Sequence, residues 1–173
     1  QFPVRGLFDI RYPSGIGFNF NWLTPLEKVG SGKGECRKQG SDIAVLSIGT
    51  MAHVTSKAIQ SIEEEYDINI AHYDLRFVRP LDEAMLHEIG KKFDKLITVE
   101  DGVVKGGFGS AVLEFMTDNE YHPKVKRLGI PDSFIEHGTQ KELYNKIGLD
   151  EEGIKKSMLE FSACTKKVKQ IEV

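Results

Sequence analysis

The sequence predicts an α/β protein, folded as a three-layer α/β/α sandwich around a mostly parallel β-sheet. Two observations support this prediction. Short apolar runs alternate with segments whose apolar residues recur at helical spacing, in the order β-α-β-α-β-α-β-α-α. The chain also has 173 residues, 40% of them hydrophobic, which is enough to bury a core without a metal or a disulfide. Right-handed crossovers between parallel strands place helices on both faces of such a sheet.

The predicted strands are short runs rich in aliphatic residues. Residues 42–48 (DIAVLSI) suit a buried strand, whereas residues 124–128 (KVKRL) alternate in the manner of a strand nearer an edge. The sequence predicts four strands in this regular part, at residues 42–48, 68–75, 95–99 and 124–128.

Helices are predicted between and after these strands. Asp82 is a candidate N-cap of the second helix, because it follows Pro80 and precedes an apolar stripe. The apolar positions at helical spacing are Val54, Ala58, Ile59 and Ile62, then Met85, Leu86, Ile89 and Phe93, then Val112, Phe115 and Met116. Two short helices are expected at residues 140–147 and 151–161.

Residues 1–34 differ in composition from the remainder. They contain six glycines and three prolines, one strand-like run at residues 8–12, and a linker-like stretch at residues 24–34. The regular α/β pattern begins near residue 40. We therefore expect two parts, 1–34 and 35–173. Because the chain begins without an initiator Met, we expect it to be a fragment of a longer protein.

Composition argues against several classes of function. A net charge of −3 argues against a nucleic-acid binder, which normally has a clustered basic face. No apolar run approaches the ~20 residues that span a bilayer, and no signal segment is recognised, so no membrane association is expected. Cys36 and Cys164 lie far apart and form neither a metal-binding spacing nor a disulfide framework. This usage favours a reducing compartment, the cytoplasm.

Ligands of open α/β sheets bind beyond the carboxyl ends of the strands. Glu100 and Asp101 follow the third predicted strand and can do proton chemistry only if brought near other acids, so solvated turn carboxylates are the preferred interpretation. Thr50 is expected to cap the first helix. Asp74 and Arg76 are expected to form a structural ion pair rather than a ligand clamp.

The turn Gly106-Gly107-Phe108-Gly109 is not a phosphate loop, because it lacks the GxGxxG pattern and no Lys-Ser/Thr follows it. We expect its glycines to permit close packing at an interface with another subunit or domain. None of the five histidines forms an HxH or HxxxH pair, so no zinc site is predicted, and His137 is interpreted as part of a helix entry. No complete catalytic constellation is found, which indicates a domain that assists chemistry performed elsewhere.

Several stretches together resemble one family, the 1-deoxy-D-xylulose-5-phosphate synthases, which are thiamine-diphosphate enzymes of the transketolase superfamily. The segment IPD at 130–132, FIEHGT at 134–139 and GLD at 148–150 is the most specific to this family. The other matching stretches are IRYP at 10–13, LTPL at 23–26, GKG at 32–34, AVLSIGTM at 44–51, DLRFVRPLD at 74–82, TVED at 98–101 and GGFGSAV at 106–112.

The resemblance implies a transketolase-type C-terminal domain at 35–173, preceded at 1–34 by the end of the pyrimidine-binding domain and a linker. It implies a homodimeric full-length enzyme that uses thiamine diphosphate and Mg²⁺. The reaction joins pyruvate and D-glyceraldehyde 3-phosphate into 1-deoxy-D-xylulose 5-phosphate and CO₂, for isoprenoid, thiamine and pyridoxal synthesis. The family's metal-diphosphate motif and activating glutamate are absent from this sequence. We therefore expect no catalytic residue, cofactor or metal in the fragment, which should be inactive alone.

One motif departs from the family pattern. The family usually reads Arg-Tyr-Pro-Arg-Gly, whose second Arg is thought to hold the substrate phosphate, and Ser14 occupies that position here. The resemblance therefore implies Arg11 and Ser14 as substrate-binding residues. A serine hydroxyl donates a hydrogen bond but supplies no charge, so either Arg11 or a residue outside the fragment compensates, or the acceptor binds more weakly.

Two alternatives stay open. The LRFVRPLD and GGFG stretches also occur, in altered form, in β subunits of 2-oxo-acid dehydrogenases, so the chain is alternatively a non-catalytic assembly domain that docks a partner core. The other alternative is a free-standing α/β ligand-binding domain that starts near Glu35, with residues 1–34 dispensable.

Overall fold

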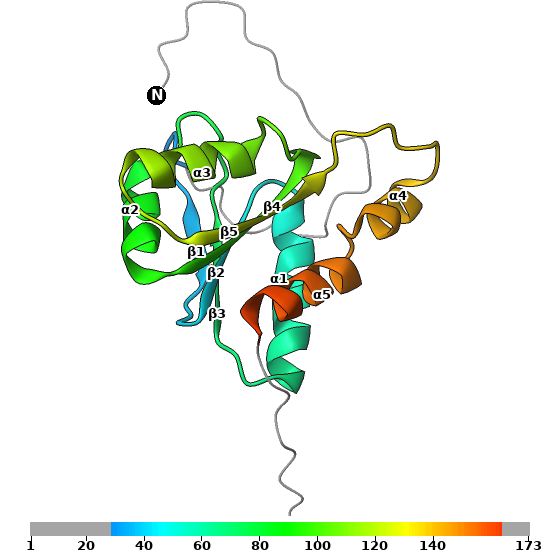
Figure 1. Cartoon of the computed structure of the whole chain (residues 1–173), viewed down its shortest axis with the longest axis horizontal. Coiled ribbons are helices and arrows are strands. Elements are labelled where there is room, and N and C mark those ends of the chain that lie inside the picture. The colour runs from blue at the N-terminus through cyan, green and yellow to red at the C-terminus, as the bar shows by residue number, and fades with distance from the viewer. Residues whose placement is uncertain (1–28, 164–173) are drawn as a thin grey trace, which may run out of the picture.

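The computed structural model describes residues 29–163, and within them the predicted α/β/α architecture is confirmed (Figure 1). The strand-like run at 8–12 and the proposed substrate residues Arg11 and Ser14 lie outside the described residues, as does Cys164. The division at residue 34 into two domains therefore stays a prediction.

A five-stranded sheet forms the middle layer of the described part. Its strands are β1 (Glu35–Lys38), β2 (Ile43–Ser47), β3 (Ile70–Asp74), β4 (Lys95–Val103) and β5 (Lys124–Ile130), in the spatial order β1-β3-β2-β4-β5. The contacts of β2 with β3 and β4, and of β4 with β5, are parallel. Only β1 is antiparallel, and it pairs with β3 at one edge.

Two strands differ most from the prediction, while β2, β3 and β5 differ at their ends by one or two residues. β1 was not predicted, because its sequence ECRK is charged and largely exposed and carries no apolar alternation. β4 continues to Val103, past the predicted end at residue 99, so Glu100 and Asp101 belong to a strand and not to a turn. This extension decides where the two acidic side chains lie.

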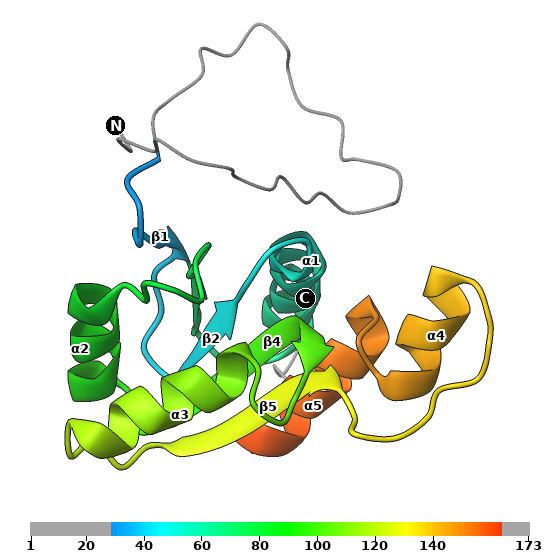
Figure 2. The same ribbon diagram turned by 90° about the horizontal axis from the view of Figure 1, so that it is seen from above.

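Helices cover both faces of the sheet (Figures 1 and 2). One face packs against α1 (Met51–Glu65) and α5 (Glu151–Ser162), and the other against α2 (Glu83–Lys92) and α3 (Phe108–Asp118). The short helix α4 (Gln140–Ile147) lies beyond the ends of β4 and β5. None of the helices within residues 29–163 has the length and apolar character needed to cross a membrane.

The two hydrophobic cores lie on opposite faces of β2, which explains its continuous apolar run. Ile43 and Val45 face the α1–α5 core, whereas Ala44 and Leu46 face the α2–α3 core, and all four are buried. A strand covered on both faces gains no advantage from alternating polar residues. The chain leaves β2 toward β3 on one side and returns to β4 on the other, so the carboxyl ends of β2 and β4 form the topological switch point of the sheet.

Candidate functional site

The carboxyl ends of β2 and β4 meet in a depression of about 320 Å³, at the position where open α/β sheets bind ligands. The structure therefore brings together Gly49, Thr50, Glu100 and Asp101, which the sequence placed at separate strand ends. We name this cavity the switch-point depression. Its lining residues are Ile48, Gly49, Thr50, Val78, Glu100, Asp101, Gly102 and Phe108.

Glu100 caps helix α3 from inside the fold. Its side chain is buried, with 4% of the residue exposed. Oε2 accepts the backbone N–H of Phe108 and Oε1 accepts that of Gly109, both at 2.8 Å. A carboxylate at the N-terminus of a helix satisfies free amides and complements the helix dipole. The expectation that Glu100 is a solvated turn carboxylate is therefore wrong. Strand β4 continues past Glu100, and its buried side chain contacts the start of α3.

The glycine turn packs tightly, as its composition indicated. A Cβ atom on Gly107 would overlap Glu100 Oε2 and the carbonyl oxygen of Val103, and one on Gly109 would overlap Thr98 Oγ1. These close approaches occur within the domain and leave no room for a phosphate at the start of α3. The proposed role of Gly106, Gly107, Phe108 and Gly109 at a subunit interface stays a prediction.

Asp101 is engaged by helix α4. The Tyr144 hydroxyl donates to Asp101 Oδ2 at 2.6 Å and accepts a hydrogen bond from Gln140 Nε2 at 2.9 Å. Burial, together with the bond to Asp101, raises the pKa of Tyr144 to about 12. The carboxylate thus fixes α4 to the end of β4. Neither acid of the depression is placed for proton transfer.

Two other predictions at the strand ends are wrong in detail. Thr50 already has helical backbone angles (φ −61°, ψ −25°), and its side chain makes no capping bond to α1. Asp74 does not pair with the Arg76 guanidinium. It accepts from Arg37 Nη2 at 3.0 Å and from the Arg76 backbone N–H at 3.1 Å, while the Arg76 side chain pairs with Glu35. Arg37 and Glu35 both belong to the unpredicted strand β1.

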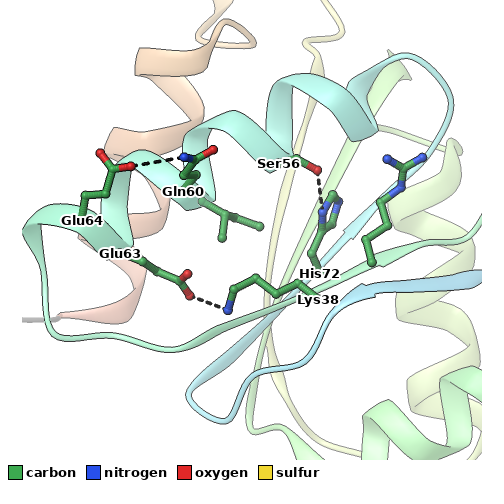
Figure 3. Close-up of a pocket in the computed structure, with 8 residues that line it drawn as sticks. Lys38, Ser56, Gln60, Glu63, Glu64 and His72 are labelled. Atoms are coloured by element: carbon green, nitrogen blue, oxygen red, sulfur yellow. Dashed lines mark hydrogen bonds and ion pairs between the residues drawn. The ribbon is translucent and has the colours of Figure 1, made fainter. Parts of the chain in front are cut away.

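A second cavity, of about 440 Å³, lies between α1 and the β1–β3 edge of the sheet (Figure 3). Within it the Lys38 Nζ bonds Glu63 Oε1 at 2.8 Å, and Gln60 Nε2 bonds Glu64 Oε1 at 3.3 Å. Its charged side chains are therefore largely matched within the domain. The lining residues are Arg37, Lys38, Ser56, Ile59, Gln60, Glu63, Glu64 and His72.

His72 is the buried centre of this cavity, with 1% of the residue exposed. The Ser56 hydroxyl donates to the Ala52 carbonyl at 3.0 Å, so it accepts the proton of His72 Nδ1 at 3.1 Å, and this network assigns the tautomer. Nε2 then accepts from the Ser47 hydroxyl at 2.8 Å. Burial, reinforced by the nearby Arg37 charge, lowers the pKa of His72 to about 4. The imidazole is consequently neutral at physiological pH.

The Ser47–His72 contact has the distance of a nucleophile–base pair but cannot serve as one. Ser47 has no exposed surface, so no substrate reaches its hydroxyl. A histidine whose pKa is near 4 is also a weak base at neutral pH. We interpret the cluster as a satisfied polar network inside the fold. The sequence showed no signal for it, because Ser47, Ser56 and His72 share no motif.

His137 lies exposed in the turn before α4, in keeping with a helix entry. The turn ends in a capping box. The Glu142 backbone N–H donates to Thr139 Oγ1, and the Thr139 backbone N–H donates to Glu142 Oε2 at 2.8 Å. Among the described residues, no group of three or more His, Cys, Asp or Glu side chains is arranged to hold a metal ion.

Comparison with known sequences identifies relatives. Residues 32–154 match the family described as transketolase, C-terminal domain. The 1-deoxy-D-xylulose-5-phosphate synthase of Phocaeicola vulgatus is 55% identical over 161 residues, which are 93% of this chain and 26% of that protein. The enzyme of the same name from Bacteroides fragilis is 52% identical over 156 residues, covering 90% of this chain and 24% of that protein. The chain thus spans about a quarter of the length of these curated relatives.

Solved structures share the fold. A split-gene transketolase, solved as an inactive β4 tetramer, superposes with a TM-score of 0.69 at 27% identity, covering 78% of this chain and 44% of that one. The transketolase of Campylobacter jejuni superposes with a TM-score of 0.55 at 15% identity, over 75% of this chain and 18% of that one. At that identity the likeness supports the fold alone.

Proposed function

This chain belongs to the transketolase C-terminal domain family, and from that membership we propose that it is the C-terminal part of a 1-deoxy-D-xylulose-5-phosphate synthase. The complete enzyme condenses pyruvate with D-glyceraldehyde 3-phosphate on thiamine diphosphate and Mg²⁺, and acts as a cytoplasmic homodimer. The observation that carries the proposal is the 55% identity to a protein of that name, sustained over 93% of this chain.

Within that enzyme, we assign residues 35–173 a supporting role. The candidate acids and bases of the domain bond to its own groups: Glu100 to the start of α3, Asp101 to Tyr144, and His72 to two serines. A group committed in this way is not free to bind substrate. Arg11 and Ser14 are proposed to contact the phosphate of D-glyceraldehyde 3-phosphate, and the glycine turn 106–109 to face another subunit or domain.

The alternative, a docking domain of a 2-oxo-acid dehydrogenase β subunit, is not favoured. Two relatives that carry the synthase name match at 55% and 46% identity, over 93% and 86% of the chain. The stretches shared loosely with dehydrogenase subunits make up only part of that length.

A chimera tests the proposal. The matching C-terminal quarter of the Phocaeicola vulgatus synthase is replaced by this chain, and formation of 1-deoxy-D-xylulose 5-phosphate from pyruvate and D-glyceraldehyde 3-phosphate is measured. We expect activity close to that of the parent. The control is the parent truncated at the same boundary, which we expect to be inactive. A chimera that folds, dimerises and binds the cofactor but does not turn over would contradict the proposal.

The isolated chain gives a second test. Calorimetry with thiamine diphosphate and Mg²⁺ should show no tight binding to the 173-residue chain, and pyruvate should not be consumed. Micromolar cofactor binding, or product above background, would show that the chain carries an active site of its own.

A further inference from the structure

We infer that the carboxyl edge of the sheet is the surface through which this domain packs against the preceding part of the enzyme, with Phe134 as its main anchor. The inference rests on the proposed function, which makes this chain the C-terminal quarter of a longer polypeptide. We define the carboxyl-edge surface as the switch-point depression, which includes Val78, together with Val103 and Phe134.

Large hydrophobic residues are exposed on this edge. Val78 lies in the loop after β3, Val103 ends β4, and Phe134 lies in the loop after β5, and they are 40%, 46% and 89% exposed. A single exposed apolar residue needs no explanation, but several of them at one edge of the sheet, of which Val78 also lines the depression, indicate an interaction surface. The other exposed large hydrophobic residues within residues 29–163 are Val29, at 53%, and Leu113, at 38%.

The loop that carries Phe134 runs out beyond the ends of β4 and β5 before it reaches α4 (Figures 1 and 2). Surface ion pairs lie on both sides of the ring, Asp132 with Lys105 at 3.1 Å and Glu136 with Lys146 at 2.7 Å. Its last residue, Thr139, is fixed in the capping box of α4. The loop thus contacts the rest of the domain on either side of an aromatic side chain that is itself 89% exposed. Aromatic residues of this kind dominate the binding energy of protein interfaces.

The switch-point depression has the chemistry of a surface that receives apolar groups. The Glu100 oxygens point to the amides of α3, and the Asp101 carboxylate accepts from Tyr144. The lining that remains is contributed by Ile48, Val78 and Phe108, by glycine backbone and by the side chain of Thr50, and it is mostly apolar. By contrast, the cavity at the amino ends of the strands is lined by Asp42, Asp67, Lys92, Asp94 and Lys95 among others. An edge with that many charged side chains is typical of a surface exposed to solvent and not of a buried interface.

The described chain also enters the domain at the carboxyl edge. The backbone N–H of Gly34 donates to Asp82 Oδ2 at 3.0 Å, and Lys33 Nζ lies 3.3 Å from Asp82 Oδ1. Asp82 follows β3 and caps α2, so it belongs to this edge. The described chain therefore enters the domain at the β1–β3 end of this edge, on the side of Val78. In an enzyme about four times the length of this chain, this covalent connection keeps the remaining three quarters at high local concentration there.

Photo-crosslinking in the full-length enzyme tests the inference. Benzoyl-phenylalanine is placed at position 134, and in a control enzyme at position 113, where Leu113 is 38% exposed on α3. After irradiation and digestion, we expect position 134 to give crosslinks to peptides that precede this chain, and position 113 to give none. No crosslink from position 134, or crosslinks only to residues 29–163 of the same or another copy, would overturn the inference.

A substitution gives an independent readout. Because Phe134 is 89% exposed, Phe134→Ser removes little packing inside the domain. In the full-length enzyme we expect it to speed hydrogen exchange in the loop at residues 131–138, whereas Leu113→Ser should leave that loop unchanged. Equal exchange in both variants would contradict the inference. Synthase activity is measured on the unsubstituted enzyme. If the unsubstituted enzyme has no synthase activity, the proposed function is refuted. The crosslinking result still decides whether the carboxyl-edge surface contacts the preceding part of the polypeptide.

Discussion

The carboxylate of Glu100 holds the backbone N–H of Gly109 at an Oε1–N distance of 2.8 Å, and its second oxygen holds the N–H of Phe108 at the same distance. Helix α3 therefore begins on an anion supplied by the neighbouring strand β4. This arrangement explains why the turn before α3 is glycine-rich without being a phosphate site. The place that a ligand anion takes in other α/β proteins is occupied here by the chain itself.

Removing this carboxylate should destabilise the domain. In Glu100→Ala two buried N–H groups lose charge-assisted hydrogen bonds, and we expect the free energy of unfolding to fall by about 3 kcal/mol. Glu100→Gln keeps one acceptor oxygen, so its free energy of unfolding should lie between that of Glu100→Ala and that of the wild type. Urea denaturation of the 173-residue chain measures the effect. Glu114→Ala, at an exposed position on α3, is the control, and an equal loss in both Ala variants would contradict this account.

Gly107 should tolerate no side chain. Its φ is −86°, so the backbone conformation itself is open to other residues. The obstacle is the overlap of a Cβ with Glu100 and with the Val103 carbonyl. We expect Gly107→Ala to lower the free energy of unfolding by about 2 kcal/mol or more.

The neighbouring Gly106 provides the matched control for this prediction. It has φ +74°, and no atom lies within 4 Å of the point that a Cβ would occupy there. Gly106→Ala should therefore cost only the backbone strain, about 1 kcal/mol. Equilibrium denaturation of the two variants decides the point. A Gly107→Ala protein as stable as Gly106→Ala would show that the turn relaxes easily.

The sequence predicted the elements that local patterns specify. Helix α4 has the predicted bounds, because a capping box begins it and Gly148 ends it in the left-handed conformation. Strand β1 could not be predicted, since it exists through its pairing with β3 and the Arg37–Asp74 ion pair, 37 residues apart. The role of Glu100 was missed for a related reason. It depends on where β4 ends relative to α3, which residue type and spacing do not encode.

Burial of His72 should make stability depend on pH. Burial first, and then the charge of Arg37, lower its pKa from 6.5 to about 4. At a pH between these two pKa values, His72 is protonated in the unfolded state and neutral in the native state. The free energy of unfolding is therefore undiminished above pH 6.5, and it falls by about 3 kcal/mol in total as the pH is lowered toward 4.

Denaturation of the 173-residue chain at a series of pH values measures this loss. His72→Gln should flatten the pH dependence between 6.5 and 4, whereas His137→Gln, at an exposed position, should keep the wild-type slope. An unchanged slope in His72→Gln would mean that other groups cause it.

Tyr144 should titrate abnormally. Burial and the bond to Asp101 raise its pKa from 10.0 to about 12, so its contribution to stability is present below pH 10 and is lost as the pH rises toward 12. Phenolate absorbance should show a step near pH 12 that disappears in Tyr144→Phe. Asp101→Asn removes the carboxylate and should move the step to lower pH. The exposed Asp118→Asn is the control, and a step that Asp101→Asn leaves in place would show that burial alone sets this pKa.

Ser14→Arg should strengthen binding of the acceptor substrate in the full-length enzyme, if this turn faces the phosphate as proposed. A charge-assisted contact contributes about 1.5–3 kcal/mol when well aligned, which corresponds to a roughly 10- to 100-fold lower KM for D-glyceraldehyde 3-phosphate. The KM for pyruvate should hardly move, because pyruvate carries no phosphate.

Arg11→Ala should act in the opposite direction if Arg11 now anchors the phosphate, and a melting curve separates this effect from damage to folding. Steady-state kinetics on the two variants then distinguish the cases. A charge added at position 14 can change the acceptor KM only where the phosphate lies within reach of it, because an exposed charge is screened beyond about 10 Å at moderate salt. If both variants stay folded and neither alters that KM, the Arg-Tyr-Pro-Ser-Gly turn is structural, and the phosphate is held by residues outside this chain.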